Sequence, residues 1–149
     1  VAQNYGAHRF DRIREGVRAS LIQLESVNVL MCAAMLLTRR AVVSLFIDAP
    51  TEEVISYAGG YLTVVAPFYV VLGLLIVYRS AVQSMGNSTA PFLASVVELV
   101  MRIGGALGLA RVLGYTGVCC SSPLAWIGAT ALLIPFYRCE MRKGKNIAA

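Results

Sequence analysis

Charged residues are scarce in this chain. They make up 14% of its 149 residues, whereas about 25% is usual in a soluble domain. Hydrophobic residues make up 58%, and the mean hydropathy is +0.70. This composition excludes an ordinary soluble enzyme and favours a membrane protein of four or five helices, which leaves no room for a soluble catalytic domain.

The sequence also lacks the motifs of most enzyme and metal sites. His8 is the single histidine, and no Cys-x-x-Cys motif occurs among Cys32, Cys119, Cys120 and Cys139. No metal site is therefore predicted. The vicinal pair Cys119–Cys120 has a redox interpretation, but packing as small apolar side chains is favoured. Because no Gly-x-Ser-x-Gly motif or phosphate-binding loop is present, we predict neither an enzyme nor a cofactor.

The net charge of +5 does not point to nucleic acid. The basic residues lie just outside the apolar runs, where anionic lipid and the positive-inside rule explain them. No basic helix face with interleaved aromatic residues is present. The predicted partner of these charges is therefore the lipid bilayer, and nucleic acid is not expected.

Two long runs contain no charged residue, Val54–Tyr78 and Val112–Tyr137. A membrane helix needs roughly 20 mostly apolar residues to cross about 30 Å of hydrocarbon. With two further segments that carry a few polar residues, the sequence predicts an all-α membrane protein. The four predicted spans are 17–37, 60–78, 91–113 and 117–137.

The predicted connections contain residues that break or cap helices. Thr51 is placed to cap a short helix whose first turn is acidic. The loop 84–91 is rich in Gly, Asn and Ser and brings Pro91 to the start of the next helix, and 114–117 forms a tight turn. The amphipathic stretch Thr38–Tyr57 has too short an apolar run for a fifth span, so we interpret it as an interfacial connection.

The basic residues near the span ends predict the orientation. One side holds eight of them and the other side holds three. This bias places both termini in the cytoplasm and predicts a multi-pass protein of the cell membrane. The eight are Arg9, Arg12, Arg14, Arg79, Arg138, Arg142, Lys143 and Lys145, and the three are Arg39, Arg40 and Arg111.

Glu98 and Arg102 are the first candidate functional residues. They are four positions apart inside the third predicted span, so they share a helix face and can pair. A charge at the bilayer centre costs about 2.5–3.5 kcal/mol on insertion scales and usually faces a protein interior or a watery cavity. The pair is either part of a coupling-ion or substrate path, or an ion pair that fixes helix packing.

Glu25, with Gln23 and Asn28, is the second candidate. These side chains either line a cavity or mark a first span that begins deep in the membrane interface. Pro67 is a candidate hinge, because proline removes a helical hydrogen bond and kinks the chain, although a static kink is an equally common outcome. The glycines of the third span match a small-xxx-small pattern that favours packing inside one bundle.

Several short stretches, taken in order, resemble the multidrug and toxic compound extrusion (MATE) transporters. Together they cover nearly the whole chain. The stretches are Ala2–Ala7 (AQNYGA), Arg12–Gly16, Leu45-Phe46 with Asp48, Glu53-Val54, Tyr61-Leu62 with Pro67-Phe68, Tyr78–Ser88, Glu98-Leu99 with Arg102, and Gly114-Tyr115 with Gly117-Val118.

The resemblance implies a fold and a function. MATE transporters have twelve helices in two six-helix lobes, and the chain resembles helices nine to twelve, at the end of the second lobe. It would then be a fragment of a secondary active multidrug efflux antiporter that exports small cationic or amphiphilic compounds in exchange for sodium or protons. The missing N-terminal lobe of the same protein would be its partner.

The chain departs from the family pattern in two ways. The first lobe is missing, with the acidic residue that many members use. The span 60–78 lacks the carboxylate that one branch uses for its cation. The choice between sodium and protons as the coupling ion therefore stays open. Two other functions also stay open: a lipid-linked saccharide flippase of similar architecture, and a membrane scaffold that transports nothing.

Overall fold

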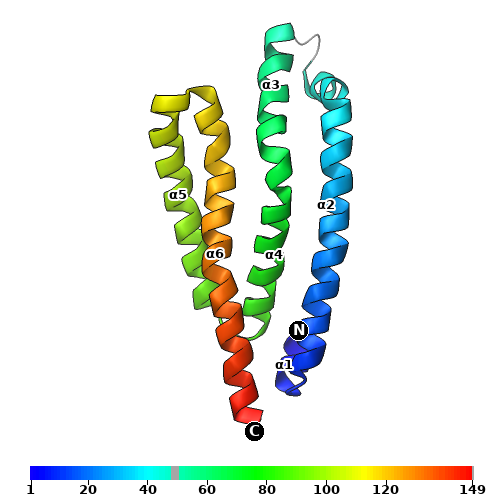
Figure 1. The fold of residues 1–149 in the computed structure, drawn as a ribbon, viewed down its shortest axis with the longest axis vertical. Helices are drawn as coiled ribbons and strands as arrows, with labels where there is room; N and C mark the ends of the chain where they lie inside the picture. The colour runs from blue at the N-terminus through cyan, green and yellow to red at the C-terminus, as the bar shows by residue number, and fades with distance from the viewer. Residues whose placement is uncertain (48–50, 149) are drawn as a thin grey trace.

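The structure, a computed structural model, describes residues 1–47 and 51–148. Long helices run beside one another, and both ends of the described chain lie at the same end of the molecule (Figure 1). Helix α6 packs against α5 and α4, and α2 packs against α3 and α4. The elements are α1 (Ala2–Gly6), α2 (Phe10–Phe46), α3 (Glu52–Val65), the 3₁₀ helix η1 (Ala66–Phe68), α4 (Tyr69–Ser84), α5 (Thr89–Leu113) and α6 (Tyr115–Ala148).

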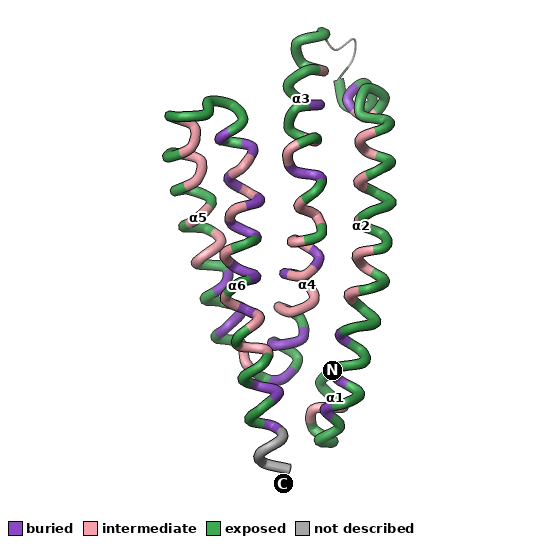
Figure 2. The backbone as a smooth tube through the Cα atoms, in the orientation of Figure 1, coloured by how far each residue is buried: buried purple, intermediate pink, exposed green. Residues whose placement is uncertain are grey.

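Four helical segments are long and apolar enough to cross a membrane: α2, the run from α3 to α4, α5 and α6. Helices α2 and α5 are mostly exposed, whereas buried residues concentrate along α6 (Figure 2). Large apolar side chains on the outer helices are open, with Leu37 86% and Leu107 64% exposed. Because water would penalise such surfaces, lipid or other protein must cover them. The predicted all-α membrane fold is confirmed.

Helix α2 extends further than the sequence predicted. Thr38–Phe46 is helical and continues α2, and its last turns bend away from the axis of the preceding helix (Figure 1). The residues from Glu52 to Tyr57 are helical as well and begin α3. The stretch Thr38–Tyr57 is therefore helical over most of its length, and its interpretation as an interfacial connection stays a prediction. Local helix propensity continues α2 past the apolar run that defined the span, and Asp48–Pro50 lie outside the described residues.

Helix ends follow the local chemistry. Thr51 caps α3 by accepting a hydrogen bond from the backbone N–H of Val54 at 3.4 Å, as predicted. Asn87 accepts one from Ala90 N–H at 3.0 Å near the start of α5. Gly114 alone separates α5 from α6, with a φ of 58° that favours glycine. These local contacts fix where α3 and α5 begin and where α5 gives way to α6.

Pro67 interrupts the second membrane segment. It lies in η1, which separates α3 from α4. A proline inside a helix lacks the N–H that would bond to the carbonyl four residues earlier. The tighter 3₁₀ turn at this position is a usual response to that loss, and it divides the span into two helices.

Glycines bring α5 and α6 into close contact, and of the three glycines of the third span (Gly104, Gly105 and Gly108) only Gly105 takes part. A Cβ at Gly117 would overlap the backbone of Leu109, and one at Gly105 would lie 3.3 Å from the Cα of Ser121. By contrast, a Cβ at Gly104 or Gly108, the residues of the small-xxx-small pattern, would meet no heavy atom of another described helix within 4 Å. Gly104 and Gly108 therefore face away from α6, and the packing glycines lie on a different helix face.

The end of the bundle that holds both termini has its own apolar core. Phe10, Ile13 and Met141 are buried there, with Ile13 only 1% exposed. A Cβ at Gly144 would overlap the ring of Phe10, so the Phe10 side chain at the start of α2 packs directly on the backbone of α6 near its end. This contact fixes the two helices relative to each other close to the termini.

Candidate functional site

A polar contact joins α2 to α4 in the interior of the predicted membrane region. Asn28 Nδ2 donates to the backbone carbonyl of Tyr69 at 3.0 Å and to Glu25 Oε2 at 3.3 Å. Both side chains lie over Gly73, where a Cβ would overlap Glu25 Oε1 and Asn28 Nδ2. The missing side chain of Gly73 therefore makes the space that these two polar groups occupy. We call Glu25, Asn28, Tyr69 and Gly73 the Glu25 cluster.

The carboxylate of Glu25 is incompletely compensated. Its Oε1 is buried and has no hydrogen-bond partner among the described residues. No described Lys, Arg or His forms an ion pair with it either. A carboxylate withdrawn from water without a positive partner is costly in its charged form. The group is therefore chemically suited to take up a cation.

The structure separates the predicted polar residues of α2. Glu25 and Asn28 are partly buried and touch each other, whereas Gln23 is exposed. In a helix, positions three apart share a face and positions two apart do not. The sequence grouped all three, but helix geometry brings only Glu25 and Asn28 into one site.

A second donor reaches the same part of α4 from α6. The hydroxyl of Thr130, which is 5% exposed, lies 3.5 Å from the backbone carbonyl of Val71. The first turns of α4, just after the interruption at Pro67, thus receive side chains from α2 and from α6. Because carbonyl oxygens have two lone pairs, these contacts can add to the helix's own hydrogen bonds.

Glu98 pairs with two arginines. Its Oε1 accepts from Arg102 Nη2 at 2.7 Å within α5, and its Oε2 accepts from Arg79 Nη2 on α4 at 2.8 Å. Side chains in helices lean toward the N-terminus. Since α4 and α5 run in opposite directions, Arg79 and Glu98 lean toward each other. The side chains of Glu98, Arg79 and Arg102 are 18%, 32% and 46% exposed. The carboxylate is the least exposed group and is fully paired.

Arg79 is the residue that sequence reasoning missed in this contact. It was counted among the residues that flank a span, but it lies within α4 and pairs across to α5. Its Nε is buried without a hydrogen-bond partner in the described part of the chain. Removing it from the count leaves seven basic residues against three, so the predicted orientation keeps its basis. The antiparallel arrangement of α4 and α5 could have indicated this pair, but only if the alignment of the two helices along their axes had been known.

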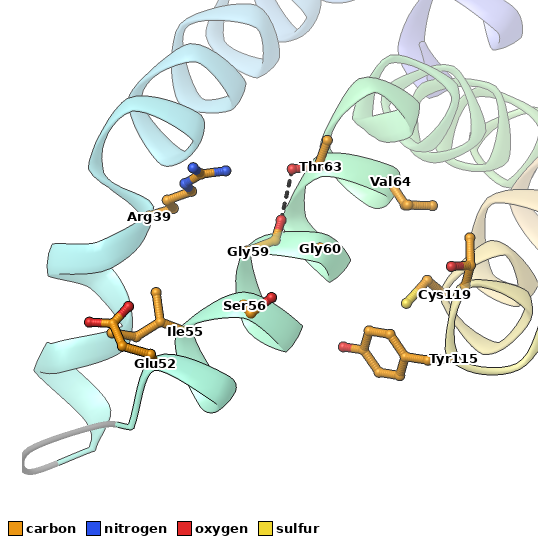
Figure 3. Close-up of a pocket in the computed structure, with 11 residues that line it drawn as sticks. Arg39, Glu52, Ile55, Ser56, Gly59, Gly60, Thr63, Val64, Tyr115 and Cys119 are labelled. Carbon is orange, nitrogen blue, oxygen red and sulfur yellow. Dashed lines mark hydrogen bonds between the residues drawn. The ribbon is translucent and has the colours of Figure 1, made fainter.

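A pocket of about 520 Å³ lies at the end of the bundle away from the termini (Figure 3). Arg39 of α2, Thr63 of α3 and Cys119 of α6 contribute to its wall. Tyr115 also lines it, and its hydroxyl donates to the carbonyl of Tyr57 at 2.9 Å. Cys119 lines the pocket as a buried free thiol, whereas its neighbour Cys120, also a free thiol, is not part of the wall. Among the described residues, the pocket combines hydroxyl groups, apolar surface and one guanidinium, but no pair of facing carboxylates.

These features define a multi-pass membrane protein with charged and polar groups inside its helix bundle. The model of the MatE family matches residues 1–107, from α1 through most of α5. The chain belongs to the MatE family. The comparisons with curated proteins and with solved structures gave no match.

Membership confirms the resemblance seen in the sequence. Proteins of this family are membrane transporters and not enzymes, so the chain is part of the class of efflux transporters and flippases. Helix α6 lies beyond the matched residues, yet it forms the centre of the packing. The assignment of the four spans to helices nine to twelve stays a prediction.

Proposed function

We propose that the protein is a cation-coupled exporter of small cationic or amphiphilic compounds, and that Glu25 binds the coupling ion. Sodium or a proton is the ion, and both neutralise a carboxylate. The observation that carries the proposal is the buried, unpartnered Oε1 of Glu25 inside a predicted span. An ionisable residue in such a place is a functional site by default.

Comparison with Glu98 supports the choice of Glu25 as the ion-binding residue. Glu98 already receives two guanidinium groups within 2.8 Å, so a further cation gains little there. Glu25 has only the amide of Asn28 as a described side-chain partner. We therefore assign ion binding to Glu25, and we assign Glu98, Arg79 and Arg102 to helix packing.

The position of the Glu25 cluster links it to a movement of the second span. Asn28 binds the first residue of α4, directly after η1 and Pro67. A carboxylate that changes charge alters its interactions with Asn28 and with the adjoining carbonyl. Pro67 is the hinge in this proposal, because the interrupted hydrogen-bond ladder allows α3 to tilt relative to α4.

The test is dye efflux by the full-length protein in sealed vesicles. We expect ethidium export to follow either an imposed pH gradient or an imposed sodium gradient, and the two arms identify the ion. Glu25→Gln should bind ethidium but lose at least tenfold of the gradient-driven rate, because the site can no longer change its charge.

Glu15→Gln is the matched control. It removes the same charge from α2 at an exposed position outside the predicted span, and it should keep the wild-type rate. Thermal unfolding of both variants checks that they fold. Gradient-driven export that survives Glu25→Gln contradicts the role of Glu25. Wild-type vesicles that export nothing under either gradient contradict the export function itself.

A further inference from the structure

Three arginines surround a small pocket between the start of α2 and the end of α6. The pocket has a volume of about 280 Å³ and is lined by Arg14 of α2 and by Tyr137, Arg138, Met141 and Arg142 of α6. We call it the arginine pocket. It belongs neither to the Glu25 cluster nor to the Glu98 contact, and the proposed transport function does not use it.

The charge of this pocket is uncompensated within the described residues. None of its three arginines forms an ion pair there, and all three are exposed. Glu140, the nearest acid along α6, is buried and engaged by Asn87 and Lys143 at 2.9 and 3.1 Å. The pocket therefore offers three guanidinium groups to an anion.

The floor of the pocket is apolar. Met141 is 6% exposed, and beside it the ring of Phe10 occupies the space over Gly144. Tyr137 is held by an edge-to-face contact with Tyr78 at 5.2 Å between ring centres. The Phe10–Gly144 contact brings the start of α2 against the end of α6, so Arg14 of one helix and Arg138 and Arg142 of the other line the same pocket.

The arginine pocket lies at the predicted boundary between membrane and water. Tyr137 ends the predicted span 117–137, and tyrosine is typical of the boundary between membrane and water. Arg138 and Arg142 follow Tyr137 toward the end of α6, and Arg14 lies near the start of α2. Leu21 and Ile134, both partly exposed, lie one to two turns toward the membrane interior. A ligand here can place an anionic group on the arginines and acyl chains on the apolar surface above them.

We infer that the arginine pocket binds the phosphate of an anionic phospholipid. Guanidinium groups form forked, charge-assisted hydrogen bonds with phosphate oxygens. Basic pockets between membrane helices on the cytoplasmic side are suited to such head groups. The predicted orientation places this end of the bundle toward the cytoplasmic leaflet, where anionic lipids are enriched. A bound lipid would link α2 to α6 at the end where both termini lie.

The test measures retained lipid on the full-length protein by native mass spectrometry. The protein is taken from mixed micelles of phosphatidylcholine and phosphatidylglycerol. We expect a preference of at least tenfold for phosphatidylglycerol, and a loss of about fivefold for each of Arg14→Gln, Arg138→Gln and Arg142→Gln. Replacing the same arginines by lysine should reduce the preference for phosphatidylglycerol less, because lysine keeps the positive charge but cannot form the forked pair of hydrogen bonds.

Arg12→Gln is the matched control, since Arg12 is exposed on the same helix and does not line the pocket. It should keep the wild-type preference. An equal loss in Arg12→Gln, or no preference in the wild type, overturns the site. Displacement of the lipid by millimolar inorganic phosphate overturns its assignment to lipid. If a glutamine variant fails to fold in detergent, the lysine variants and the wild-type preference still decide the question.

Discussion

At the residue scale, the charges inside the bundle differ in how they are balanced. Glu98 lies between Arg79 and Arg102, so this group carries one net positive charge, whereas Glu25 has only the amide of Asn28 as a described partner. A partly buried ion pair is destabilised strongly when one partner is removed. The two carboxylates should therefore respond differently to the same substitution.

We expect Glu98→Gln to lower stability on the order of 2 kcal/mol, because it leaves two arginines without their carboxylate. Adding Arg79→Gln should restore more stability than adding Arg102→Gln, since Arg79 is the less exposed of the two. Thermal unfolding of the three variants in one detergent measures the order. Equal recovery by both double variants would show that the contact between α4 and α5 contributes nothing beyond the pair within α5.

Part of this group was predictable from the sequence. The spacing of Glu98 and Arg102 is sufficient to place them on one helix face, and the structure pairs them. Arg79 was not predictable, because its contact depends on the register of α4 against α5. The same limit applies to Gly73, whose role appears only when Glu25 and Asn28 are seen to lie over it.

At the scale of elements, the contact between α5 and α6 depends on a few glycines. Gly117→Ala should destabilise the protein by about 1–3 kcal/mol, because the methyl group meets the backbone of Leu109, which cannot move aside as a side chain can. Gly108→Ala is the matched control in open space, and it should be neutral or raise stability by about 0.5–1 kcal/mol through helix propensity.

Unfolding temperatures of the two alanine variants give the comparison. A Gly117→Ala protein as stable as the wild type would mean that the two helices separate at little cost. The existence of these helices followed from the apolar runs, but the choice of packing glycines did not. The small-xxx-small spacing identifies a helix face without saying which neighbour, if any, covers it.

At the scale of the whole molecule, a chain that crosses the membrane four times has both of its ends on the same side. Both ends of the described chain lie at one end of the bundle (Figure 1). We expect Thr116→Cys, in a background without the native cysteines, to react with an impermeant maleimide added outside cells. Arg12→Cys should react only after the membrane is opened. Labelling of Arg12→Cys in intact cells would reverse the predicted orientation.

The single-residue connection at Gly114 has a consequence for how the protein is made. With one residue between them, α5 and α6 form an antiparallel hairpin, and we expect the two helices to enter the bilayer together. Arg79 leaves the ribosome nineteen residues before Glu98, which is roughly 1–4 s at ordinary rates of synthesis. We expect Arg79 to extend its side chain toward the membrane surface during that interval, because its carboxylate partner does not yet exist. The ion pair between α4 and α5 can therefore form only after the first half of the hairpin has been made.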